Sequence, residues 1–217
     1  MISNNILINT AYFPPVNYIS LLCSAEKVYI EREENYTKQT YRNRCVICSA
    51  NGPMILSVPI LLGSFHKTPV KDIRVDYSKR WQQIHLRTLL SSYRSSPFFE
   101  YYFTLFENVI TANHSFLLDL NLNSLDVVLV ATGIKIPVEY TSEFVKDPAG
   151  QLDYRNRISP KTKNVDSPSG LIRYNQVFED RFGFIPGLSI IDLIFNVGPD
   201  AGKYLQSITH PVLPVSS

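Results

Sequence analysis

Apolar positions in the first part of the chain form short runs separated by polar or proline-rich segments. The apolar run at residues 6–9 predicts a buried strand, residues 16–24 predict a brief helix, and residues 27–31 predict a second strand. A strand, loop, helix and strand in so few residues indicate two parallel strands joined by a right-handed crossover. In such a unit, ligands collect beyond the carboxyl ends of the strands.

A β-hairpin is predicted next, because two runs of β-forming residues flank Asn51 and Gly52, a pair that suits a tight turn. We expect its first strand to begin near Lys38. The two-residue period of a strand then places side chains alternately on two faces. One face would carry Lys38, Thr40, Arg42 and Arg44, and the other Gln39, Tyr41, Asn43 and Cys45. Residues 71–77 predict another strand.

From Ser78 onward the apolar period lengthens to that of helices. Ser78 is the expected N-cap of a first helix, and one face of it would hold Trp81, Ile84, His85, Leu89 and Ser92. Pro97 is expected to begin a second helix. Asn123 or Ser124 is expected to begin a third, which Gly133 ends, and residues 134–144 then predict a strand.

Residues 146–170 are polar and rich in proline, serine and lysine, so we expect a flexible loop there, either a lid or a connector. Order returns near the C-terminus, where Ser189 and Asp192 resemble a capping pair, Gly198 a helix stop and Pro199 the start of a last helix. The predicted class is α/β: a small mixed sheet begun by a strand-loop-helix-strand unit, with a β-hairpin extension and a helical second half. We expect one domain over residues 1–217.

Composition adds limits on partners and compartment. The 217 residues include 21 basic and 19 acidic side chains, so the net charge of +2 favours neither nucleic acid nor anionic lipid. No apolar run approaches the roughly 18 residues that span a bilayer, and membrane insertion is not expected. Three cysteines suit a reducing compartment, and we expect a cytoplasmic protein. Cys45 and Cys48 lie three apart in a predicted strand without a second ligand pair, so no metal site is predicted.

The cations of the predicted hairpin are the first candidates for chemistry. Lys38, Arg42 and Arg44 cannot all enter an apolar core unpaired, because burying an unpaired charge is very costly. A clamp for phosphate or carboxylate suits arginine, whose fork donates two parallel hydrogen bonds. The alternative is a solvated face, or ion pairs with Glu31, Glu33 and Glu34.

Rings in the loop after the first strand are the second candidates. Pro14 and Pro15 are expected to hold Phe13 extended and to present Tyr12 and Tyr18 as preorganised platforms for a sugar or nucleobase. The alternative is that these rings close one end of the sheet.

His85 is the candidate acid or base, because it lies four residues after Trp81 on one helix face and titrates near neutral pH. The alternative is a buried histidine bonded to a backbone carbonyl. Motifs for a serine nucleophile elbow, a phosphate loop, a dinucleotide fingerprint or a zinc protease are absent from the sequence. No cofactor is identified.

Several blocks of the chain occur in a familiar order: "AYFPPVNYISLL", "VYIEREENYTKQTYRNRCVI", "NGPMILSVPI", "DIRVDY", "WQQIHLRTLLSSYRSSPFFEYY" and "RFGFIPGLSIIDLIFNVGPDAGKYL". Together they resemble the WbqC-like family. One departure is Thr10-Ala11, where many members have Gln-Pro, so no role of that glutamine carries over. The resemblance implies a place in bacterial O-antigen or other surface-polysaccharide biosynthesis, and some members are described as glycine transferases.

Two functional classes follow. The first is a transferase that moves a glycyl or other aminoacyl group to a sugar, with His85 as acid or base and an anionic donor or sugar as its small-molecule ligand. The residues expected to bind that ligand are Tyr12, Tyr18, Glu31, Lys38, Arg42, Asn43, Arg44 and Trp81. The second is a non-catalytic assembly protein that meets a biosynthetic partner, or a second copy, through Phe182, Phe184, Ile185 and Leu188.

Overall fold

The computed structural model describes residues 4–61, 67–148, 150–160 and 173–208. It contains a sheet of four parallel strands in the order β5-β2-β1-β6. These strands are β1 (Asn5–Asn9), β2 (Lys27–Glu31), β5 (Val138–Tyr140) and β6 (Leu152–Asp153). Because all four run the same way, their carboxyl ends share one edge of the sheet.

The predicted strand-loop-helix-strand unit is confirmed. Helix α1 (Val16–Cys23) connects β1 to β2, which pair in parallel register from Asn5 with Lys27 to Asn9 with Glu31. Four of the five residues of β1 are buried, as expected for a strand between two covering layers. The α/β class is likewise confirmed, and the antiparallel part is confined to a separate two-stranded sheet.

That separate sheet is the predicted hairpin, made of β3 (Arg44–Ser49) and β4 (Gly52–Ser57). The turn is Ala50-Asn51, and Gly52 follows it with a φ of 99°, which only glycine adopts freely. The prediction that the first strand begins near Lys38 is wrong. Residues before Arg44 form a turn and the 3₁₀ helix η1 (Tyr41–Asn43), so Lys38, Arg42 and Arg44 do not share a strand face.

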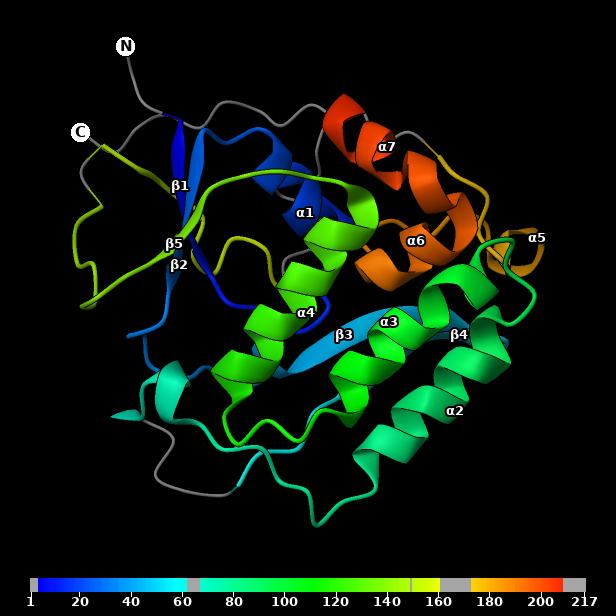
Figure 1. Cartoon of the computed structure of the whole chain (residues 1–217), viewed down its shortest axis with the longest axis horizontal. Coiled ribbons are helices and arrows are strands. Elements are labelled where there is room, and N and C mark those ends of the chain that lie inside the picture. Colours follow the sequence, from blue (N-terminus) through cyan, green and yellow to red (C-terminus); the bar gives the residue numbers. More distant parts are fainter. Residues whose placement is uncertain (1–3, 62–66, 149, 161–172, 209–217) are drawn as a thin grey trace.

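Three helices lie side by side in Figure 1: α2 (Trp81–Tyr93), α3 (Phe99–Thr111) and α4 (Leu117–Thr132). The buried face of α2 is the predicted one except for Ile84, which is exposed. Ser78 does not cap α2, and Pro97 precedes α3 by two residues. Helix α4 begins earlier than predicted, at Leu117, and ends at Gly133 with a φ of 67°, as predicted.

Between the hairpin and α2, residues 71–77 do not form the expected strand. The segment contains the 3₁₀ helix η3 (Val70–Asp72), followed by isolated bridges at Arg74 and Val75. Pro69 and the turn of η3 interrupt the ladder that a strand needs, so alternation of apolar residues alone was misleading here.

The C-terminal part consists of α5 (Glu179–Phe182), α6 (Ile190–Val197), the 3₁₀ helix η4 (Gly198–Asp200) and α7 (Ala201–Ser207). Ser189 caps α6, as predicted, by accepting a hydrogen bond from the Ile191 N–H. Asp192 does not complete the cap. Its carboxylate instead accepts hydrogen bonds from the phenols of Tyr93, at 2.8 Å, and Tyr174, at 2.6 Å.

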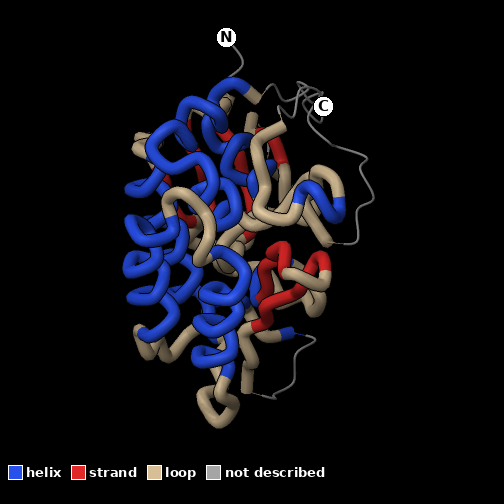
Figure 2. Tube along the Cα trace, turned by 90° about the vertical axis from the view of Figure 1, so that its right-hand side faces the viewer, coloured by secondary structure: helices blue, strands red, loops and turns tan. Residues whose placement is uncertain are grey.

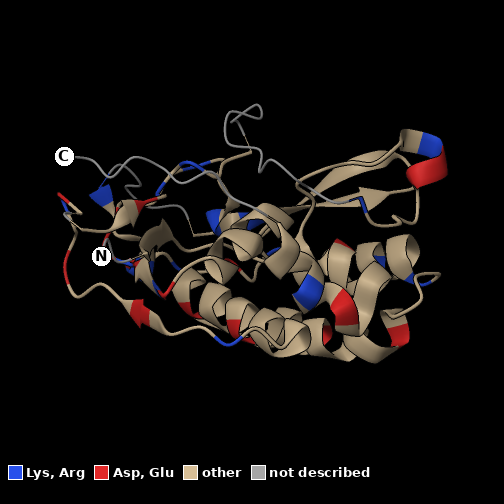
Figure 3. Ribbon diagram, turned by 90° about the horizontal axis from the view of Figure 1, so that it is seen from above, with Lys and Arg blue, Asp and Glu red and all other residues tan. Residues whose placement is uncertain are grey.

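The described part of the predicted loop at 146–170 is partly ordered as sheet, because β6 pairs with β1 through Ile6 and Leu152. Residues 149 and 161–170 lie outside the described residues. Figure 2 shows most of the helices gathered on one side of the molecule, with the two-stranded hairpin toward the other. Residues of both charge signs are found along the ribbon in Figure 3, and their numbers nearly balance, with a net charge of +2.

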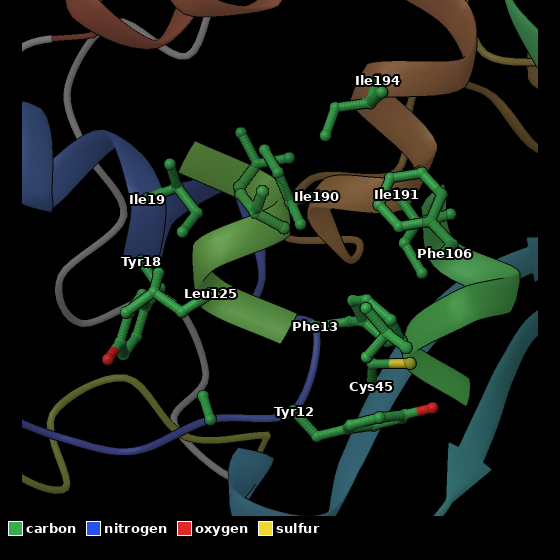
Figure 4. Packing of buried hydrophobic residues seen from close by; sticks show 14 of the residues in the cluster. Tyr12, Phe13, Tyr18, Ile19, Cys45, Phe106, Leu125, Ile190, Ile191 and Ile194 are labelled. Atoms are coloured by element: carbon green, nitrogen blue, oxygen red, sulfur yellow. The ribbon is translucent and has the colours of Figure 1, made fainter. Parts of the chain in front are cut away.

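The proline-containing loop after β1 contributes rings to the core. In Figure 4, Tyr12 and Phe13 point toward Cys45 and Phe106, whereas Tyr18 lies apart from them. Phe13 is not extended as expected but has a φ of 37°, a strained value for a bulky residue. Ser124 and Ser189 hold it there: the Phe13 N–H donates to the Ser124 hydroxyl, and the Ser189 hydroxyl donates to the Phe13 carbonyl.

Close packing of α7 on the end of α4 gives a first prediction. A methyl group at Gly202 would fall inside van der Waals contact of the Thr132 carbonyl oxygen. Backbone cannot yield as a flexible side chain would, so we expect Gly202→Ala to lower the free energy of unfolding by about 1–3 kcal/mol. Urea unfolding measures this. Gln206→Ala, an exposed change on the same helix, should stay within about 0.5 kcal/mol of the parent, and equal effects of the two changes would contradict the prediction.

Candidate functional site

The carboxyl edge of the parallel sheet carries a cluster of buried polar side chains. Glu31, the last residue of β2, is fully buried, and its carboxylate accepts hydrogen bonds from four groups. The donors are the Glu33 N–H, the Val145 N–H, the Thr141 hydroxyl and Arg155 Nη1. Arg155 also forms a bidentate pair with Asp153 at the end of β6. Glu31 is therefore held by segments from three strand ends.

A second buried ion pair lies next to this one along the chain. Arg42 donates from Nε and Nη2 to the two oxygens of Glu34, at 2.7 and 2.6 Å. The same Nη2 donates to Asn156 Oδ1 at 2.9 Å, and the Asn156 N–H donates to the Asn9 side chain at the end of β1. Arg42 is one of the largest fully buried side chains. Burial raises the pKa of Glu34, while the Arg42 guanidinium opposes that rise.

The two arginines belong to a repeated tetrapeptide. Tyr-Arg-Asn-Arg occurs at residues 41–44 and again at residues 154–157. The first copy forms η1, and the second forms a turn in which Asn156 has a φ of 62°, a left-handed value that asparagine tolerates. The hydrogen bond between Arg42 and Asn156 joins the two copies across the end of β1.

Three buried polar atoms at the first tetrapeptide have no hydrogen-bond partner in the described part of the chain. They are Asn43 Oδ1, Arg44 Nε and Asn121 Oδ1. The amide nitrogen of Asn43 donates to the Val58 carbonyl and that of Asn121 to the Arg42 carbonyl, so both unpaired atoms are acceptors. Unpaired buried polar atoms are rare because each costs about 1–3 kcal/mol. These three atoms are therefore candidates for contact with a ligand.

A narrow gap lies beside the Asn121 side chain, whose oxygen is unpaired among the described residues. Its polar lining comes from Thr10, Tyr18 and Asn121, and the rest of its wall is apolar. It has no room for a water molecule in this structure. The Tyr18 hydroxyl is already engaged, because it donates to the Asn9 carbonyl at 2.8 Å.

Tyr12, Trp81 and His85 form a different cluster, between α2 and the hairpin. The Ser57 carbonyl lies 3.2 Å from His85 Nε2 and accepts a hydrogen bond from its N–H, so Nδ1 accepts the hydrogen bond from the Tyr12 hydroxyl, at 3.1 Å. Burial lowers the pKa of His85 to about 4. The ring is therefore neutral at pH 7 with both nitrogens bonded, as in the structural alternative considered for this residue. Trp81 packs edge-on against both rings.

The predicted site residues therefore fall into two groups. Tyr18, Glu31, Arg42, Asn43 and Arg44 surround the strand ends or the first tetrapeptide, while Tyr12, Trp81 and His85 lie in the ring cluster. Lys38 is exposed in the turn before η1. The rings of Tyr12 and Tyr18 are buried, so neither offers an open stacking face.

Sequence reasoning missed Asn121, Arg155 and Asn156, and named Glu34 only as an ion-pair alternative. The repeated tetrapeptide was the signal that would have identified Arg155 and Asn156, because two copies of an uncommon polar motif in one chain invite a search for a shared site. The sequence around Asn121 does not indicate a site residue, since Asn121 lies between two leucines in an apolar helix.

The model of the WbqC-like protein family matches residues 10–167, a span that contains both tetrapeptides and every predicted site residue. The chain belongs to the WbqC-like protein family. An uncharacterized protein of Mycobacterium tuberculosis, Rv1507c, is 25% identical to it over 227 residues, covering 92% of this chain and 96% of the relative. No solved structure matches it significantly.

Two further structural findings bear on this WbqC-like chain. Within the described ranges, no helix has both the length and the apolar character that crossing a membrane requires. Among the same residues, no three His, Cys, Asp or Glu side chains converge as a metal-binding group. Cys45 and Cys48 are both buried, and burial raises the pKa of Cys45 to about 12, so its thiol is protonated at neutral pH.

Proposed function

We propose that this WbqC-like protein is a cytoplasmic transferase of bacterial surface-polysaccharide biosynthesis that moves a glycyl or other aminoacyl group to a sugar. The observation that supports it most is the set of unpaired atoms at the first tetrapeptide. Asn43 and Asn121 each offer a buried acceptor oxygen, which suits sugar hydroxyls or an amine. Arg44 offers a cation for the anionic group of an activated donor.

Arg44 replaces Arg42 as the proposed anion ligand, because their electrostatic surroundings differ. Arg42 is already bound by Glu34, which would repel a second anion. No ion pair or hydrogen bond engages the Arg44 side chain among the described residues. We assign Arg42, with Glu31, Glu34 and Arg155, the task of holding the strand ends in place. Arg44 would stabilise negative charge on the departing group.

Ligand binding provides the test. In a thermal-shift screen of nucleotide sugars, aminoacyl donors and inorganic phosphate, we expect one class of anion to stabilise the parent protein. At a hundredfold excess over its Kd, a ligand adds about 2.7 kcal/mol, or about 5–10 °C in Tm for a chain of this size. Arg44→Ala should abolish this shift.

Two control variants make this screen specific. Arg181→Ala removes an arginine of α5 that donates to the Ala50 carbonyl in the hairpin turn. Arg44 lies at the opposite end of the hairpin, so Arg181→Ala should keep the full shift. His85→Gln should also keep both the shift and the turnover, since its ring is engaged within the fold. A shift that survives Arg44→Ala, or a loss of turnover in His85→Gln at unchanged affinity, would contradict these assignments.

One observation supports the alternative function, a non-catalytic assembly protein. Phe182 is exposed next to Gly52, and Met54 and Ile55 of β4 are exposed on the same hairpin. Leu188 is buried and cannot belong to such a surface, and Phe184 and Ile185 are half-buried. If no donor binds, and a pathway protein is captured by the parent but not by Phe182→Ser, the assembly function replaces the transferase.

A further inference from the structure

The exposed face of α2 is positively charged along its whole length. Arg80, just before the helix, Arg87 within it and Arg94 at its end are seven residues apart, which places them on one stripe about 10.5 Å from each other. Residues 81–93 contain no Asp or Glu. All three arginines are exposed, and Ile84, with 58% of its surface accessible, lies between the first two.

The two neighbouring helices carry the opposite charge at the same spacing. Glu100 and Glu107 are seven residues apart on α3, and Asp119 and Asp126 are seven apart on α4. Neither helix contains Lys or Arg. The three helices form one layer, because α3 packs against both α2 and α4 (Figure 1). One layer therefore presents a basic half beside an acidic half.

These seven charged side chains have no ion-pair partner among the residues that the structure describes, although α2 and α3 are in contact. Large apolar side chains are also exposed here. Tyr101 on α3 is 77% accessible, and Ile84 and Leu90 on α2 are 58% and 39% accessible.

A hollow on α2 has a lining that suits a tyrosine side chain. It is shallow and open to solvent, has a volume of about 620 Å³, and is lined by Arg87, Leu90, Ser91, Arg94 and Ser95. Its aliphatic and guanidinium walls suit an aromatic ring with a polar tip, because arginine stacks on ring faces and leucine packs against ring edges.

We propose that this layer is a dimerisation surface whose partner is a second copy of the same chain. In this dimer a two-fold axis runs along the groove between α2 and α3, so that α2 of each copy lies against α3 of the other. Arginines spaced by seven residues then face glutamates spaced by seven residues, and each Tyr101 enters the hollow between Arg87 and Arg94 of its partner. The acidic α4 flanks the contact.

A second copy fits better than an unrelated partner because both complementary halves are on one face. A two-fold contact uses each surface element twice, with residue i meeting j and j meeting i. A nucleic acid or an anionic membrane would be attracted by α2 and repelled by α3 and α4. Charge complementarity therefore favours self-association over those partners.

Sedimentation velocity on the full chain tests the proposal. We expect the parent to be a dimer of the 24.8 kDa chain that dissociates as salt is raised. The double variant Arg87→Glu/Arg94→Glu should be monomeric, and so should Glu100→Arg/Glu107→Arg. The variant with all four changes should dimerise again, because the charges then complement each other with signs exchanged. Tyr101→Ala should weaken dimerisation at least tenfold, as expected for a central aromatic anchor.

Controls separate a lost interface from a lost fold. Each variant should keep the far-ultraviolet circular dichroism and cooperative unfolding of the parent, since four of the five positions are exposed and Glu107 is half-buried. Lys203→Glu on α7, outside this layer, should leave the dimer intact. A parent that stays monomeric at all accessible concentrations overturns the proposal. So does a dimer that survives both charge reversals, or one that the fourfold exchange fails to restore.

Discussion

Arg42→Ala is expected to lower the free energy of unfolding by about 3–5 kcal/mol at pH 7, the largest effect among the changes considered. Removing this guanidinium leaves the Glu34 carboxylate buried without its bidentate partner. It also removes the hydrogen bond that ties Asn156 to η1. Urea unfolding of parent and variant gives the difference.

The pH dependence identifies the cause. Burial already raises the pKa of Glu34, and loss of the adjacent cation raises it further. A carboxyl group whose pKa is raised in the folded state stabilises the fold at low pH and loses that contribution as pH rises through the folded pKa. The difference in free energy of unfolding between the parent and Arg42→Ala should therefore become smaller as pH falls toward 5. A deficit that is constant with pH would point to lost packing rather than to an unpaired charge.

Removing both charges provides the matched control. Arg42→Met/Glu34→Leu replaces the pair with apolar groups and should recover much of the loss, because it leaves no buried charge unpaired. Lys203→Ala breaks an exposed pair with Asp200 and should change stability by less than about 1 kcal/mol. An Arg42→Ala deficit as small as that of Lys203→Ala would refute the structural role assigned to Arg42.

Asp192 and His85 are expected to act on stability with opposite pH dependence. Burial raises the pKa of Asp192 from 3.8 to about 6, although phenols of Tyr174 and Tyr93 partly oppose the rise. Burial lowers the pKa of His85 from 6.5 to about 4. The contribution of Asp192 to the free energy of unfolding is present below about pH 3.8 and is lost as pH rises through about 6. The His85 contribution is present above about pH 6.5 and is lost as pH falls through about 4.

Each contribution amounts to about 3 kcal/mol across its window, since one pKa unit corresponds to 1.36 kcal/mol. In the parent the two nearly cancel between about pH 4 and 6. Relative to the parent, His85→Gln should therefore be least destabilised at pH 4, and its deficit should grow by about 3 kcal/mol toward pH 7. Asp192→Asn should show the reverse, with its deficit greatest at pH 4.

Urea midpoints at several pH values between 4 and 7 measure both trends. Differences from the parent remove the contributions of all other titrating groups. Because Asp192 and His85 share no contact in the structure, the double variant should show the sum of the two single effects. Parallel stability curves for parent and His85→Gln would show that the imidazole is accessible to solvent and not buried as described.

The local sequence pattern predicted an element correctly wherever its conformation depends on residues that are close together in the sequence. The β1-α1-β2 unit, the paired part of the hairpin and the buried face of α2 were predicted because each depends on short-range periodicity and turn chemistry. The resemblance to the WbqC-like family was confirmed on the same basis, since motif order is a property of sequence alone. The Ser189 cap and the Gly133 stop were likewise local signals.

Predictions failed where a distant residue decided the conformation. Residues 38–43 alternate like a strand, yet Arg42 turns inward to Glu34 and to Asn156, which is 114 positions away. Helix α4 contains two polar residues that looked like its start. Asn123 instead lies within the helix with its side-chain nitrogen 3.0 Å from His114 Nε2, and Ser124 is buried, where its hydroxyl accepts a hydrogen bond from the Phe13 N–H. Propensity yields to such contacts because burial demands that every polar group find a partner.

The sequence by itself determined the family, the α/β class and most element types, since these follow from motif order and apolar period. Only the tertiary structure decided which charged side chains are paired within the fold and which are left to contact a ligand or a partner. Arg42 and Arg44 are two residues apart and chemically identical, yet one is paired with Glu34 and the other is not paired among the described residues. The reason is physical: the cost of a buried charge depends on what surrounds it in space, and for Arg42 those surroundings combine Glu34, eight positions away, with Asn156, 114 positions away.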